Sequence, residues 1–140
     1  EANPGLLRKM AKGMCELLPK DIQVLAGLEM GGIPLVTAIS LESGIPCAFV
    51  RKKAKEYGTC KFAEGAPVSG RDICIIEDVV TTGGQIIKSA NMLREAGAKV
   101  EFVLCAIQRK DDATELLAKE GLTLIPYMSM EYIKEQVGIS

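Results

Sequence analysis

The feature that most constrains this chain is a series of short, unbroken apolar runs, each separated from the next by a segment with helical spacing. The runs that we interpret as strands are 22–26, 45–50, 73–76, 100–107 and 122–125. Strands without polar/apolar alternation are typical of a parallel sheet that is covered on both faces. The segments with helical spacing are 3–18, 34–41, 85–96, 113–119 and 129–137. The sequence therefore predicts an α/β fold, a mostly parallel sheet flanked by helices.

Length and composition favour a single folded domain over residues 1–140. The chain is 48% hydrophobic and 25% charged, which is usual for a globular protein. We find no internal repeat and no interdomain linker. Residues 51–70 are polar and contain three glycines, so we expect a long loop or a ragged hairpin there.

Several classes of function are disfavoured by what the chain lacks. It has no histidine and no tryptophan, which removes imidazole catalysis and histidine-bound zinc and disfavours stacking on nucleic acid. Its 17 basic and 18 acidic residues give a net charge of -1, so we expect no nucleic-acid partner. No apolar run approaches the roughly 20 residues that span a membrane. Five cysteines without C-x-x-C spacing predict a reduced, cytoplasmic protein.

The segment Glu77–Gly84 carries the strongest chemical signal. It lies between the strand that ends at Ile76 and the helix that begins near Gln85, and ligands of parallel sheets bind where such strands end. Two glycines and two threonines before a helix suit a phosphate group, which would meet the free amides of the first turn. The two acids would repel phosphate, so they suit ribose hydroxyls or a divalent cation. The whole segment fits a ribose 5-phosphate, although an acidic strand end beside an ordinary glycine turn is the alternative.

Two further turns have unusual composition. Arg51–Gly58 places four cations within five residues, directly after an apolar strand. Such a run is either a solvated surface or, beside a ribose-phosphate site, a clamp for diphosphate. Gly27–Pro34 has two glycines before a helix, which indicates either backbone donors for an anion or a plain tight turn.

Taken in their order, these three segments resemble those of the type I phosphoribosyltransferases. Glu77–Gly84 resembles their phosphoribosyl diphosphate signature, while the R-K-x-x-K-x-x-G loop and the Met30–Pro34 turn are similar to the orotate branch. The likeness runs from about residue 5 to the C-terminus. It implies a type I phosphoribosyltransferase-like fold with a flexible basic loop. It also implies transfer of phosphoribose from phosphoribosyl diphosphate to orotate, giving orotidine 5′-monophosphate and diphosphate in UMP biosynthesis.

The resemblance also implies roles for individual residues. The residues that would bind phosphoribosyl diphosphate are Arg51, Lys52, Lys55, Tyr57, Glu77, Asp78, Val79, Val80, Thr81, Thr82, Gly83, Gly84 and Gln85. Lys52, Lys55 and Asp78 would be catalytic. Glu29, Met30, Gly31 and Gly32 would form the diphosphate loop, and Thr81 and Arg109 would bind orotate.

Magnesium is the implied cofactor, with no direct side-chain ligand expected. The implied assembly is a homodimer in which loop 51–64 reaches the neighbouring active site. Tyr57 stands where the family often has histidine, and a phenol does not titrate near neutrality. Because the chain begins at its first long helix, we expect the family's base-covering N-terminal segment to be absent.

Two other functions stay open. The first is a phosphoribosyltransferase for another base, which Arg109 and the basic loop disfavour because an uncharged base needs no cationic partner. The second is a non-catalytic regulator that binds phosphoribosyl diphosphate, which the net charge disfavours because such proteins need a nucleic-acid surface.

Overall fold

The computed structural model describes residues 3–52 and 62–138, and within them one six-stranded sheet has the order β3-β2-β1-β4-β5-β6. The strands are β1 (Val24–Leu28), β2 (Cys47–Val50), β3 (Ala63–Gly65), β4 (Asp72–Val80), β5 (Lys99–Gln108) and β6 (Thr123–Ser129). Neighbouring strands pair in parallel, except that β3 pairs antiparallel with β2. The expected α/β fold with a mostly parallel sheet is confirmed.

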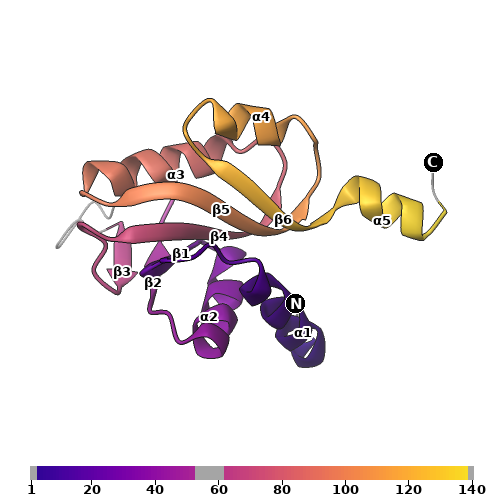
Figure 1. Cartoon of the computed structure of the whole chain (residues 1–140), viewed down its shortest axis with the longest axis horizontal. Helices are drawn as coiled ribbons and strands as arrows, with labels where there is room; N and C mark the ends of the chain where they lie inside the picture. Colours follow the sequence, from indigo (N-terminus) through magenta and orange to yellow (C-terminus); the bar gives the residue numbers. More distant parts are fainter. Residues whose placement is uncertain (1–2, 53–61, 139–140) are drawn as a thin grey trace.

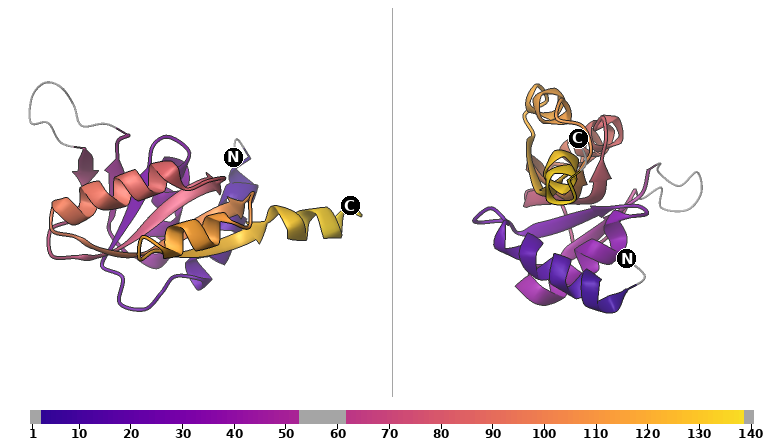
Figure 2. Two further views of the ribbon diagram at one scale, coloured as in Figure 1. Left: turned by 90° about the horizontal axis from the view of Figure 1, so that it is seen from above. Right: turned by 90° about the vertical axis from the view of Figure 1, so that its right-hand side faces the viewer.

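Helices cover both faces of this sheet. They are α1 (Pro4–Glu16), α2 (Gly32–Ser43), α3 (Gly84–Glu95), α4 (Ala113–Ala118) and α5 (Met130–Gln136). Figure 1 shows α1 and α2 on one face and α3 and α4 on the other, and the right-hand view of Figure 2 shows the same layers end-on. Helix α5 continues beyond the end of β6, away from the sheet (Figure 1). Each face of the sheet buries its own apolar core against its helices.

The expected helix caps are present. The Asn3 side chain accepts a hydrogen bond from the Leu6 amide at 3.1 Å, and Pro4 opens α1. The Ser129 hydroxyl oxygen accepts from the Tyr132 amide at 3.0 Å and begins α5. These side chains satisfy amides that have no partner inside a helix, so local sequence alone sets both helix starts.

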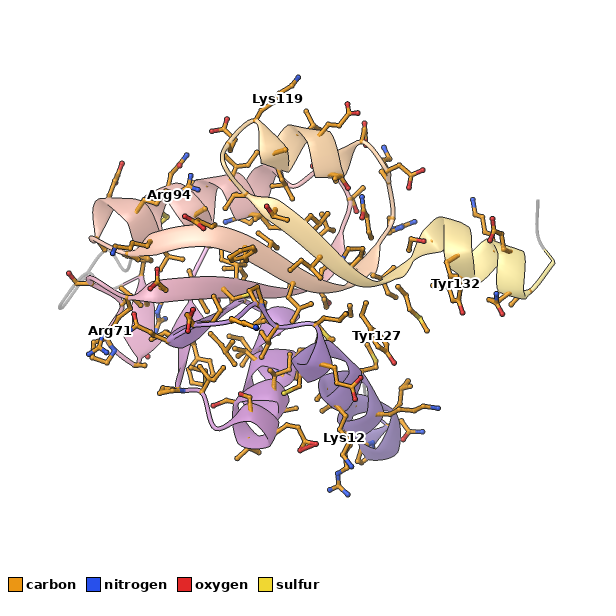
Figure 3. All side chains as sticks on the ribbon, in the orientation of Figure 1. Lys12, Arg71, Arg94, Lys119, Tyr127 and Tyr132 are labelled. Atoms are coloured by element: carbon orange, nitrogen blue, oxygen red, sulfur yellow. The ribbon has the colours of Figure 1, made fainter. Side chains whose placement is uncertain are left out.

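Side chains tie the outer elements to the sheet. Tyr127 extends from β6 toward α1 (Figure 3), where a side chain in place of Gly13 would overlap its ring. On the opposite face Arg94 donates to the main-chain oxygens of Glu120 at 2.9 Å and Val100 at 2.7 Å. These contacts hold β6 and the end of α3 in place although both lie near the edge of the fold.

Strand boundaries differ from the sequence prediction, most of all at the ends of β4 and β6. β4 extends to Val80, so the acidic pair that we placed in a loop belongs to a strand; its ladder with β5 continues through Val80 and Gln108. β6 extends to Ser129 for the same reason, because it pairs with β5 as far as Gln108. Residues 63–65 form β3 and pair antiparallel with β2, as expected for the ragged hairpin. Within the described residues no helix is long and apolar enough to cross a bilayer.

Candidate active site

The candidate residues gather at the carboxyl ends of four neighbouring strands, β2, β1, β4 and β5. These strands run parallel, so their ends meet at one edge of the sheet. After β1 the chain enters α2 on one face, and after β4 it enters α3 on the other (Figure 1). The β1/β4 boundary is therefore the switch point at which open α/β sheets bind their ligands.

The acidic pair at the end of β4 has a defined geometry. The Glu77 Oε1 atom accepts from the Asp78 amide at 2.9 Å, and the Asp78 Oδ1 atom accepts from the Val79 amide at 2.7 Å. Both carboxyl groups are half-buried. Each one is therefore fixed by a main-chain donor on its own strand and retains free acceptor capacity.

Glu77 holds its proton more tightly than an ordinary carboxyl group. Burial raises the pKa of Glu77 from 4.5 to about 8, and the neighbouring Asp78 charge adds to the rise while Lys52 opposes it. The charge of Lys52 therefore lowers the pKa of Glu77 in the same chain. Burial also raises the pKa of the Cys105 thiol to about 12, with the charges of Glu77 and Asp78 as further causes. Cys105 stays a neutral thiol and is a core residue, not a nucleophile.

The turn between β4 and α3 forms an open cradle. Gly83 has a φ of +86°, a left-handed conformation that suits glycine, and it precedes the first residue of α3. No side chain in the described part of the chain caps α3, so the amides of its first turn are available. Thr82 is exposed and Thr81 is half-buried beside this turn. A monophosphate anion fits these donors and the positive end of the helix dipole.

The turn after β1 packs directly against the end of β4. A side chain at position 31 would overlap the Asp78 carboxylate, and a Cβ on Gly32 would approach the Ile76 carbonyl oxygen at 2.5 Å. The two glycine-rich segments of the sequence are thus adjacent in space. The backbone of the expected diphosphate loop, Glu29 to Gly32, lies against the acids expected to hold ribose.

The basic segment is described only at its start. The Arg51 guanidinium forms an ion pair with Glu64 at 2.9 Å, and the Arg51 amide donates to the Phe62 carbonyl at 2.6 Å. The Lys52 amide donates to the Glu29 carboxylate at 2.5 Å. Lys55 and Tyr57 lie outside the described residues. Of the loop expected over 51–64, residues 63–64 belong to β3 and pair with β2.

Arg109 follows β5 and is exposed, with its amide donating to the Val80 carbonyl at 2.9 Å. The preceding residue, Gln108, is buried. Its side-chain amide donates to the Lys110 carbonyl at 2.9 Å and to the Thr114 hydroxyl at 2.8 Å. Gln108 therefore shapes the loop that carries Arg109, a role for which the sequence gives no local signal.

A pocket of about 430 Å³ opens beside the site, on the α2 side of β2. Its lining consists of Glu29, Met30, Ile33, Pro34, Phe49, Val50, Arg51 and Glu64. It shares Glu29 and Arg51 with the site but does not include the cradle. Sequence reasoning placed Glu29 in the diphosphate loop but did not predict its bond to Lys52, and it missed Glu64 as the partner of Arg51, because each acid is far from its partner along the chain.

The open start of a helix, an acid pair and a glycine turn at one switch point suit a phosphorylated sugar as ligand. The chain belongs to the phosphoribosyltransferase family, and the family described as "Phosphoribosyl transferase domain" matches residues 2–139.

Within that family it is similar to orotate phosphoribosyltransferases. It is 49% identical to the enzyme of Nocardioides sp. over 92% of this chain and 72% of that protein. It is 40% identical to the enzyme of Pyrococcus horikoshii over 99% of this chain and 76% of that protein. The structure of Mycobacterium tuberculosis orotate phosphoribosyltransferase with 5-phospho-alpha-D-ribosyl 1-diphosphate matches with a TM-score of 0.80 and 28% identity. That match covers 91% of this chain and 75% of the other.

Proposed function

We propose that residues 1–140 form a phosphoribosyltransferase domain that transfers the 5-phosphoribosyl group from phosphoribosyl diphosphate to orotate. The products are orotidine 5′-monophosphate and diphosphate, and the step belongs to UMP biosynthesis. The observation that carries this proposal is the contact between the diphosphate turn at Gly31 and the acid Asp78, beside the open start of α3. Similarity to two orotate phosphoribosyltransferases at 49% and 40% identity supports orotate as the acceptor.

In this proposal each segment contacts a different part of the donor. The amides and hydroxyls of residues 79–85 hold the 5-phosphate, and Glu77 and Asp78 hold the ribose hydroxyls. Positive charge develops on the ribose ring during transfer, and the carboxylate of Asp78 lies where it can stabilise that charge. Arg109 offers a guanidinium fork to the orotate carboxylate. Thr81 follows Val80, whose carbonyl accepts from the Arg109 amide.

The basic segment would balance the negative charge that grows on the leaving diphosphate. Arg51 and Lys52 lie at the carboxyl end of β2, next to the diphosphate turn of β1. We propose that Lys55 joins them during catalysis and that Tyr57 supplies a hydrogen bond. Together these cations would stabilise the departing group more strongly than the intact donor.

Magnesium is part of the proposal. In the described residues no three His, Cys, Asp or Glu side chains gather as a metal site, whereas Mg²⁺ is commonly held by one or two carboxylates together with substrate oxygens. The acid pair at the end of β4 would act on the ion through the ribose hydroxyls that it holds, without a direct side-chain ligand. The ion would be held through the hydroxyl and diphosphate oxygens of the donor, and it would neutralise charge on the diphosphate.

We also propose a cytoplasmic homodimer in which the basic loop, beyond its start at Arg51 and Lys52, contacts the neighbouring active site. Met30 is 79% exposed and Phe49 is 37% exposed, and both line the pocket beside β2. A second copy of the chain would cover these apolar side chains. Sedimentation at several protein concentrations tests this part of the proposal, and a monomer at every concentration would contradict it.

The decisive experiment follows orotate loss by absorbance, with and without magnesium and phosphoribosyl diphosphate. We expect consumption of orotate only when both are present. Turnover of another free base in place of orotate would favour the phosphoribosyltransferase for another base. Donor binding without turnover of any base, together with a shift of DNA or RNA in a gel, would favour the regulator.

A further inference from the structure

The carboxylate of Glu29 extends the pairing between β1 and β2 by one residue. The ladder of these parallel strands ends with Leu28 opposite Val50. Beyond it the Glu29 amide donates to the Val50 carbonyl at 2.9 Å, and the Glu29 Oε1 atom accepts from the Lys52 amide at 2.5 Å. The Glu29 side chain thus holds the main chain of Lys52, which is 23 positions further along the sequence.

The opposite side of this segment is held by β3. The Arg51 amide donates to Phe62, and its guanidinium pairs with the Glu64 carboxylate at 2.9 Å. Acids from two different elements therefore fix the point at which the chain leaves β2. Lys52 departs from this point, and its charge acts on Glu77 in the same chain.

Direct contact between the Glu29 carboxylate and diphosphate would be electrostatically unfavourable. Glu29 directly precedes the turn 30–32, and a carboxylate there would repel an anion bound to that turn. The structure instead directs one oxygen of the Glu29 carboxylate to the Lys52 amide. The half-buried Glu29 side chain joins the turn and the basic segment into one unit.

We propose that Glu29 is a positioning residue: it fixes the main chain of Lys52 against the turn 30–32, so that cation and turn bind diphosphate together. This inference rests on the proposed function and assigns Glu29 a role other than direct contact with the donor. A hydrogen bond to a charged group is stronger than one between neutral groups, and small displacements of charged groups have large effects on catalysis.

Charge alone predicts the opposite effect of Glu29→Ala on diphosphate affinity. Removal of a carboxylate beside an anion site should tighten anion binding. If Glu29 positions Lys52, Glu29→Ala should instead weaken it. Glu29→Gln keeps an oxygen that accepts from the Lys52 amide while it removes the charge, so it should bind diphosphate as tightly as the wild type or more tightly.

The test is a calorimetric titration of the full chain with inorganic diphosphate in excess magnesium, together with steady-state kinetics. We expect Glu29→Ala to raise the diphosphate Kd and the KM for phosphoribosyl diphosphate by about tenfold, with the KM for orotate unchanged. Glu95→Ala removes an exposed carboxylate at the far end of α3 and should change neither constant.

Three results would overturn the proposal. These are wild-type affinity in Glu29→Ala, an equal loss in Glu29→Gln, or a parallel rise in both KM values with an earlier thermal transition, which indicates a general structural role. A wild-type chain that binds diphosphate but consumes no orotate would count against the proposed function alone. In that case the titration of the variants still decides the role of Glu29.

Discussion

The carboxylate of Asp78 occupies the space that a side chain on Gly31 would fill. The two residues are far apart in the sequence and belong to β4 and to the turn after β1. Their contact joins the acid pair expected to hold ribose to the turn expected to hold diphosphate. A side chain at position 31 could not coexist with the present position of Asp78.

Gly31→Ala should therefore impair donor binding more than stability. The φ of Gly31 is -62°, which any residue adopts, and the Asp78 side chain can turn away to relieve the overlap. We expect a rise of about tenfold in the KM for phosphoribosyl diphosphate and a loss of under about 1 kcal/mol in the free energy of unfolding. Urea unfolding and donor kinetics measure both quantities.

Gly32→Ala is the matched comparison. Its Cβ would meet the Ile76 main-chain oxygen at 2.5 Å, and this atom cannot move without disturbing β4. We expect this variant to lose about 2 kcal/mol or more of stability. Wild-type donor kinetics in Gly31→Ala would contradict the prediction, because they would show that the contact between the turn and Asp78 does not matter for donor binding.

Asp78→Asn should raise the KM for the donor while it leaves the fold intact. Asparagine keeps the oxygen that accepts from the Val79 amide at 2.7 Å but loses the charge that strengthens hydrogen bonds to ribose hydroxyls. We expect an increase of about fivefold, equivalent to about 1 kcal/mol, in the donor KM. An unchanged donor KM would contradict the assignment of Asp78 to the ribose hydroxyls.

Glu77 should make stability fall as the pH rises. Its pKa is raised to about 8 in the folded chain from its ordinary value of 4.5, mainly by burial, so the folded state binds the proton more tightly than the unfolded state. The stabilisation is complete below pH 4.5 and is lost progressively up to about pH 8. In Glu77→Gln this loss should be absent, and urea unfolding at several pH values measures it. If the free energy of unfolding changes with pH equally in both proteins, Glu77 is ionised in the folded state.

Gln108→Leu should weaken orotate binding through the loop of Arg109. Leucine has a similar volume but leaves the Lys110 carbonyl and the Thr114 hydroxyl without their buried donor. We expect a higher KM for orotate, little change in the donor KM, and a loss of about 1–3 kcal/mol in stability. The control is Gln23→Leu at the other end of the sheet, where the side chain accepts from the Asp72 amide at 2.9 Å. That variant should lose stability without a change in either KM, and an equal effect of both variants on orotate would refute the prediction.

Lys55→Ala should lower kcat by at least about tenfold, or about 1.4 kcal/mol of transition-state stabilisation. The physical reason is the loss of one cation that meets the charge growing on the diphosphate. Single-turnover kinetics at saturating substrates measure the step. A variant that turns over at the wild-type rate would remove the basic loop from the mechanism.

Much of the architecture follows from local sequence. The apolar runs predict buried parallel strands because a period-two pattern is absent, and Asn3 and Ser129 begin their helices because their side chains satisfy free amides. The threonines and glycines before α3 indicate a phosphate cradle for the same local reason. These features depend on residues within one turn or one strand of each other, so the sequence by itself determined them.

The tertiary structure decided the remainder of the site. Sheet order places Asp78 against Gly31, and Glu29 reaches Lys52 because β1 and β2 pair in one register. The raised pKa of Glu77 comes mainly from burial, and the identity of a residue does not show how deeply it is buried. Local patterns specify what each segment is, whereas distances between segments and their exposure to water depend on how the whole chain packs.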